Sequence, residues 1–197
     1  MSDLLFLSWR LQSSTAPNVV RSYEKLLRSF PWSQLSRGAT TVRVVAVATG
    51  EPAFFEESLE HPVDIEQLLS VVREYAAADV SLIVDGYWDL WQFEKGEWKL
   101  MPARVALEAY GPEFESDRED DIRIDLGIDT HYLPQPDLPN HLFMARSNIR
   151  SLLHLVHDLD KQFPAATRTL WTESGANFAE LLQRSVAGED EPGDLVQ

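Results

Sequence analysis

One stretch of the chain, "DDIRIDLGIDTHYLP" over residues 120–134, alternates more strictly than any other. Its mainly apolar parity contains Ile122, Ile124, Leu126, Ile128, Thr130 and Tyr132, and its polar parity contains Asp121, Arg123, Asp125, Gly127, Asp129 and His131. A period of two is typical of an antiparallel strand with one face on the core and the other in water. The stretch therefore predicts a half-buried strand and requires antiparallel neighbours.

The remaining elements follow from apolar spacing and from the positions of proline and glycine. Strands are expected over residues 4–11, 40–49, 81–84 and 103–111, and a hairpin is expected to pair residues 88–93 with 97–101 around Gly96. Helices are expected over residues 17–30 and 63–77. A long helix is expected to start at Ser147 as N-cap and to stop at Pro164, with a last helix after Ser174 or Gly175.

This order of elements predicts an α+β fold. We expect a largely antiparallel sheet with a β-α-β, ferredoxin-like start, helices packed on one face, and two helices at the C-terminal end. Residues 1–187 are expected to form one domain, made of a sheet-rich part (1–133), a proline-rich connection (134–139) and a helical end (140–187). Residues 188–197 are expected to be a disordered acidic tail.

The composition excludes several classes of protein. The 197 residues carry a formal net charge of -15, and residues 51–145 contain 22 of the 32 acidic residues. This charge argues against nucleic-acid binding and against anionic membranes. With no cysteine there is no disulfide framework or thiolate site. The first apolar run is too short for a signal peptide or a membrane span, so a cytoplasmic location is expected.

The polar parity of the alternating stretch is a candidate site because Asp125, Asp129 and His131 lie on it. Carboxylates and an imidazole could hold a metal or act in acid-base catalysis. Same-face residues of a strand are roughly 6.8 Å apart. Chelation of one ion therefore needs a bend at Gly127, and a plain solvated face is the favoured interpretation.

Two other motifs deserve the same comparison. "HLVHD", residues 154–158, lacks the zincin spacing, so His154 and His157 are interpreted as surface residues. The hairpin concentrates aromatic residues, and Trp88 has the parity opposite to that of Trp91. One face of the hairpin cannot bury all of its rings, although core packing is the favoured interpretation. An exposed set that includes Trp98 would suit a protein interface or a sugar-stacking platform.

No phosphate-binding loop, nucleophile elbow or other catalytic signature occurs in the sequence. The leading hypothesis is therefore a non-enzymatic, cytoplasmic protein-binding domain without a cofactor or a metal. Its expected contacts are the hairpin (Trp88, Trp91 and Trp98) and an acidic surface (Glu115, Asp117 and Asp120), and its partner is a protein that is itself basic. By composition, an immunity- or antitoxin-like inhibitor fits this description. The alternative is a small enzyme or a metal- or ligand-binding domain with a cleft along residues 121–131.

Overall fold

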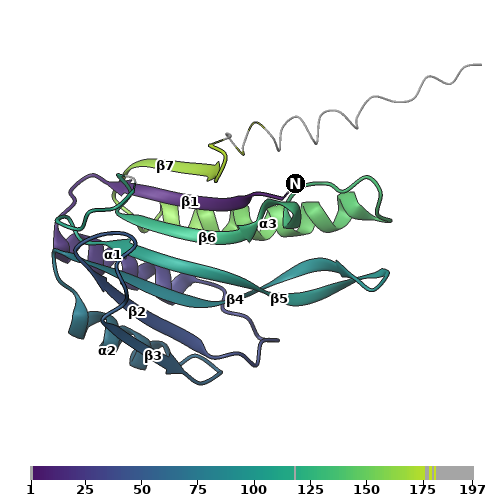
Figure 1. The fold of residues 1–197 in the computed structure, drawn as a ribbon. Helices are drawn as coiled ribbons and strands as arrows, with labels where there is room; N and C mark the ends of the chain where they lie inside the picture. Colours follow the sequence, from purple (N-terminus) through teal and green to yellow (C-terminus); the bar gives the residue numbers. More distant parts are fainter. Residues whose placement is uncertain (1, 118, 176–177, 179, 181–197) are drawn as a thin grey trace, which may run out of the picture.

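The computed structural model describes residues 2–117, 119–175, 178 and 180 of the chain (Figure 1). Seven strands within them form one sheet in the order β3-β2-β4-β5-β6-β1-β7. The strands are β1 (Leu4–Leu11), β2 (Thr40–Ala46), β3 (Phe55–Leu59), β4 (Val80–Glu94), β5 (Glu97–Tyr110), β6 (Ile122–Ile128) and β7 (Ala165–Thr172). Every neighbouring pair is antiparallel, which confirms the predicted type of sheet.

Strands β4 and β5 form one long hairpin. Their pairing runs from Ser81 opposite Tyr110 to Glu94 opposite Glu97. Lys95 and Gly96 make the turn with φ of 53° and 89°, the two positive values that a two-residue hairpin turn of type I′ requires. The short strands and the hairpin expected between residues 81 and 111 are therefore continuous. We call residues 87–104, which lie beyond the pairing of β4 with β2, the hairpin arm.

Three helices, α1 (Ala16–Ser29), α2 (Ile65–Tyr75) and α3 (His141–Asp160), and the 3-10 helix η1 (Asp129–His131) accompany the sheet. Figure 1 shows α1, α2 and α3 behind the sheet in that view. Their buried side chains, such as Leu27, Leu68 and Leu155, join alternate residues of the strands in one hydrophobic core. No helix in the described part of the chain is long and apolar enough to cross a membrane.

The strand residues whose side chains point away from this core form what we call the outer face of the sheet. One row of cross-strand neighbours on it consists of Arg43, Ile83, Glu108, Arg123 and Ser8, on β2, β4, β5, β6 and β1. Charges of both signs thus alternate across the sheet. Opposite charges on neighbouring strands attract each other, so the outer face is more than a set of solvated carboxylates.

The alternating stretch forms β6, as predicted, and Ile122, Ile124 and Leu126 are fully buried. The alternation ends at Gly127, whose φ is 77°. There the register with β1 shifts, because Leu4 pairs with Ile128 but Phe6 pairs with Asp125. The predicted core position of Ile128 is therefore wrong, since its side chain is 39% exposed. The chain continues into η1 instead of remaining a strand to Tyr132.

The ferredoxin-like start is not confirmed. The β-α-β-β-α-β unit of that fold is smaller than this seven-stranded sheet. Strands β1 and β2, which α1 connects, are separated in the sheet by β6, β5 and β4. Local periodicity identifies the strands, but the partners of β1 come from residues more than a hundred positions away.

Two expectations for the C-terminal part are wrong. Helix α3 begins at His141 with Asn140 as its N-cap, so Ser147 lies inside the helix. Within the helix Leu152 is buried, whereas its apolar neighbour Leu153 is 58% exposed. After α3 the chain returns to the sheet as β7, a strand that the sequence analysis did not expect. Most of the expected last helix and the whole expected disordered tail lie outside the described residues.

Candidate functional site

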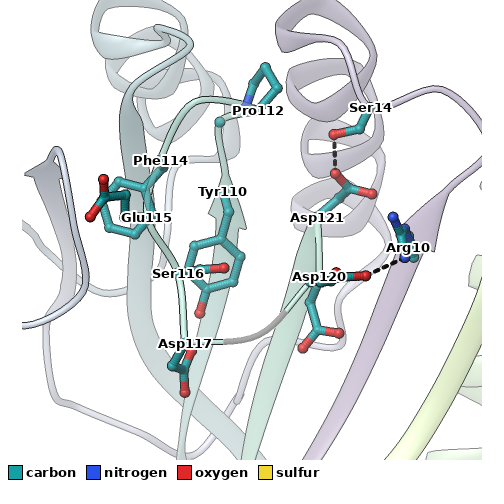
Figure 2. A pocket seen from close by; sticks show the side chains of 12 residues that line it. Arg10, Ser14, Tyr110, Pro112, Phe114, Glu115, Ser116, Asp117, Asp120 and Asp121 are labelled. Carbon is teal, nitrogen blue, oxygen red and sulfur yellow. Dashed lines mark hydrogen bonds and ion pairs between the residues drawn. The ribbon is translucent and has the colours of Figure 1, made fainter.

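The outer side of the molecule has a pocket of about 480 Å³ between the β5–β6 loop (residues 111–121) and the end of β1. Figure 2 shows Tyr110 and Phe114 along one part of this pocket and Asp120 and Asp121 along another. The three acidic residues named from the sequence, Glu115, Asp117 and Asp120, all line the pocket. We call it the acidic pocket.

The shape of the β5–β6 loop follows from its residues. Gly111 lies so close to the Ala78 backbone that a Cβ atom there would be 2.3 Å from the Ala78 carbonyl oxygen. The Phe114 amide donates to the Gly111 carbonyl at 3.0 Å. The Phe114 ring stacks on Tyr110 with 5.9 Å between ring centroids and packs in a small cluster with Val45. The loop is therefore folded against the sheet.

Backbone pairing joins this loop to the β2–β3 loop. The Glu115 amide donates to the Val47 carbonyl at 2.8 Å, and the Thr49 amide donates to the Glu115 carbonyl at 2.9 Å. The exposed Glu115 side chain is thus carried on a backbone that is held at both hydrogen-bonding groups. Because this backbone is already fixed, only the Glu115 side chain has to be ordered when a partner binds.

Arg123 is the cation behind the acidic pocket. Its side chain is only 8% exposed, and its Nη2 atom lies 3.0 Å from Asp117 Oδ1 and 3.3 Å from Asp120 Oδ2. The guanidinium also lies over the rings of Tyr110 and Trp171, 5.1 Å and 5.6 Å from their centroids. Arg123 therefore neutralises part of the acidic charge and fixes the side chains of Asp117 and Asp120.

The β1 side of the pocket is fixed by Asp121, which is buried. Its Oδ2 accepts from the Leu11 amide at 2.6 Å, and its Oδ1 accepts from the Ser14 hydroxyl. Arg10 and Glu119 form an exposed ion pair at 2.5 Å at the rim. Asp121 is thus structural, whereas Glu115, Asp117 and Glu119 are the carboxylates of the pocket that face water.

Burial changes the protonation of carboxylates near the pocket. The pKa of Glu108 is raised because the sheet and its neighbours shield it from water, although the Tyr110 hydroxyl that donates to it opposes the shift. The pKa of Asp125 is raised for the same reason, against a hydrogen bond from the Gly127 amide. Burial thus favours the protonated form of both carboxyl groups over the charged form.

The tryptophans named from the sequence are not together. Trp88 is 4% exposed and belongs to the core, in edge contact with Phe30. Trp91 and Trp98 lie on the other face of the hairpin arm and are half-buried, as their parity predicts. The Trp98 indole donates to the Pro139 carbonyl at 2.6 Å. The hairpin arm thus leaves the rings of Trp91 and Trp98 partly exposed, at a place away from the acidic pocket.

The structure places the residues of the alternative site on two elements, with Asp125 on β6 and both Asp129 and His131 in η1. Asp125 lies on the outer face of β6, whereas Asp129 Oδ1 accepts from the Asp3 amide at 3.0 Å. His131 is in η1, and burial lowers the pKa of its imidazole. Among the described residues, no group of three or more His, Asp or Glu side chains is arranged to hold a metal ion.

Sequence reasoning missed the aromatic wall of the pocket and its buried arginine. Tyr110 and Phe114 belong to no motif, and only their positions on either side of Gly111 mark a tight turn. Arg123 gave a usable signal, because it is the one cation on the polar parity of the alternating stretch. A cation in that position, next to a run of acids, indicates that the run folds back onto it.

The fold and the site thus describe an α+β protein with a seven-stranded antiparallel sheet and an acidic pocket on its outer side. Comparisons of the chain with protein-family models, with curated proteins and with solved structures found no match. The functional argument therefore depends on the geometry and charge of this chain.

Proposed function

We propose that this chain is a cytoplasmic, non-enzymatic protein-binding domain, and that its acidic pocket is the contact for a basic partner. The observation that carries the proposal is that Glu115, Asp117 and Asp120 surround one pocket. An inhibitor of the immunity or antitoxin type would have this character, since such a protein only has to occupy a surface of its target.

The charges of the pocket support a cationic partner. Five acidic residues line it against one basic residue, Arg10, and Arg123 behind them compensates only in part. Carboxylates that are already held in place lose little entropy on binding, and a net charge of -15 attracts a basic protein at long range.

The aromatic wall adds specificity for the shape of the cation. Tyr110 and Phe114 are only 6% and 9% exposed, so they offer a small apolar contact at the pocket wall for the methylene stem of a lysine or arginine. The rim carboxylates accept hydrogen bonds from its head group. Half-buried Trp91 and Trp98 of the hairpin arm are a second, weaker contact in this proposal. Trp88 is excluded from it because it belongs to the core.

The test uses reversal of the two exposed glutamates of the pocket, E115K/E119K. These substitutions leave Asp117 and Asp120 paired with Arg123, so the fold is retained. The full chain is immobilised, incubated with extract of the native cells at low salt, and the bound proteins are identified by mass spectrometry. We expect wild type to retain a stoichiometric basic protein that E115K/E119K does not retain and that added salt releases.

The matched control is E60K/E74K, which changes the net charge equally at exposed positions outside the pocket. It is expected to retain the same partner nearly as well as wild type. Equal retention by E115K/E119K and wild type would contradict the role of the pocket. Recovery of no stoichiometric partner at low salt would contradict the binding function.

A further inference from the structure

Helix α3 has a second face that the core does not use. Its buried face consists of Ala145, Asn148, Leu152, Leu155 and Leu159. The opposite face is exposed at residues spaced three or four apart, a spacing that places them in one stripe along the helix. We call these residues the α3 stripe: Phe143, Arg146, Arg150, Leu153 and His157.

The exposure of the apolar members of the stripe is unusual. Phe143 is 71% exposed and Leu153 is 58% exposed. Among the other large hydrophobic residues described, only Val47 reaches 58%. Both lie on the same side of one regular helix, ten residues apart, which is roughly 15 Å along the axis. Two apolar side chains at this spacing can both contact one partner helix.

The arginines between them are also distinctive. Arg28, Arg43 and Arg73 each form an ion pair with an acidic residue of another element. Arg146 and Arg150, in contrast, form no ion pair with any described residue. The same is true of Arg21, Arg37 and Arg104, but of these five arginines only Arg146 and Arg150 lie one turn apart on one exposed helix face. Two neighbouring arginines without acidic partners form a locally positive surface, although the chain as a whole is negatively charged.

The geometry points to the α3 stripe as a docking surface for an acidic amphipathic helix of another protein. Apolar residues of that helix would pack on Phe143 and Leu153, and its glutamates or aspartates would pair with Arg146 and Arg150. This partner is separate from the one proposed for the acidic pocket, because its charge has the opposite sign.

The net charge of the chain argues against other classes of partner for the α3 stripe. A nucleic acid would gain two phosphate contacts here and be repelled by the rest of a chain with a net charge of -15. An anionic membrane surface is repelled in the same way. A partner that presents one acidic and apolar helical face makes the favourable contacts and keeps its own charge close to the two arginines.

The test uses two synthetic, fluorescently labelled helical peptides of about 21 residues, long enough to follow the stripe. One carries leucine and glutamate on a single face, and the other has the same composition in scrambled order. Binding to the full chain is measured by fluorescence anisotropy at low and moderate salt. We expect the amphipathic peptide to bind better than the scrambled one, with affinity that falls as salt is added.

The variant R146E/R150E is expected to weaken the amphipathic peptide by about tenfold or more, which corresponds to the loss of two favourable pairs. R21E/R37E reverses two exposed arginines that do not belong to the α3 stripe and is the matched control, expected to bind like wild type. Circular dichroism checks that both variants fold.

Three outcomes would overturn the inference. The first is equal binding of the amphipathic and scrambled peptides, and the second is unchanged binding by R146E/R150E. The third is self-association of wild type in sedimentation velocity that R146E/R150E abolishes, because it would assign the stripe to a second copy of the chain. The pull-down with the acidic pocket variants has no part in this result, so the two proposals fail separately.

Discussion

Arg123 determines whether the acidic pocket keeps its shape. Its guanidinium is buried, pairs with Asp117 and Asp120, and lies between two aromatic rings. Asp117 faces water, but the side chain of Asp120 is only 16% exposed, so removal of the guanidinium leaves a largely buried carboxylate without compensation and costs about 3 kcal/mol. We therefore expect Arg123→Met to lower the free energy of unfolding by about 3 kcal/mol, measured by urea denaturation.

The comparison for Arg123 is Arg10, whose pair with Glu119 is exposed on both sides at 57% and 83%. Exposed pairs contribute roughly 0–1 kcal/mol. Arg10→Met is thus expected to change the unfolding free energy by less than about 1 kcal/mol. Equal losses in the two variants would show that Arg123 is no more important to the fold than a surface residue.

At the scale of elements, one side chain of α3 forms hydrogen bonds with the backbone of the hairpin arm. Asn148 is 2% exposed, and its amide group accepts from the Trp91 amide at 2.9 Å and donates to the Trp91 carbonyl at 2.9 Å. It thereby takes the place of a neighbouring strand on an edge of β4. The same amide donates to the His131 carbonyl at 2.7 Å and so ties η1 to the helix.

We expect Asn148→Ala to leave the backbone groups of Trp91 without partners and to destabilise the arm by about 2 kcal/mol. Hydrogen exchange should become faster at Trp91 and its neighbours, and it should stay unchanged in the part of β4 that pairs with β2. Ser151→Ala is the control, because the Ser151 hydroxyl only bonds within the helix. Exchange at Trp91 that Asn148→Ala leaves unaltered would contradict this role.

The sequence predicts elements better than their partners. Apolar parity correctly placed Ile122, Ile124 and Leu126 in the core, and it separated Trp88 from Trp91. Parity failed at Ile128, because the backbone bulge at Gly127 inverts the faces of the strand. Strand β7 was missed because four consecutive residues of its eight, 166–169, are exposed at the edge of the sheet, so no alternation marks it.

The same limit applies to the candidate site. The acids Glu115, Asp117 and Asp120 stand out by sequence as a dense run, and they do meet at one pocket. The other wall comes from Arg10 and Ser14, about a hundred residues earlier, and only the pairing of β1 with β6 brings them there. Nothing local in the chain encodes that pairing.

At the scale of the whole molecule, β1 is an interior strand although it is the first element of the chain. It pairs with β6 on one side and with β7 on the other. The sheet is therefore complete only after strands near both ends of the described chain have paired. Contacts of such long range in sequence slow folding. The acidic pocket and the α3 stripe then offer charge of opposite sign.

The net charge of -15 also governs how salt affects stability. Folding brings the acidic residues together, and salt screens their repulsion over a Debye length of about 10 Å at 0.1 M. Salt also weakens exposed pairs such as Arg28 with Glu66, of which the described residues form five, but each contributes roughly 0–1 kcal/mol and many such pairs contribute nothing measurable. Repulsion is therefore the larger effect.

We expect the melting temperature to rise by about 2–4 °C between about 0.02 M and 0.2 M NaCl, which corresponds to roughly 1 kcal/mol for a chain of this length. E60K/E74K removes part of the repulsion at exposed positions, so it should melt at a higher temperature at low salt and respond less to added NaCl. Differential scanning calorimetry measures both quantities. A melting temperature that falls with NaCl would mean that the exposed ion pairs outweigh the repulsion, and an equal rise in E60K/E74K would assign the effect to salt acting on the apolar surface.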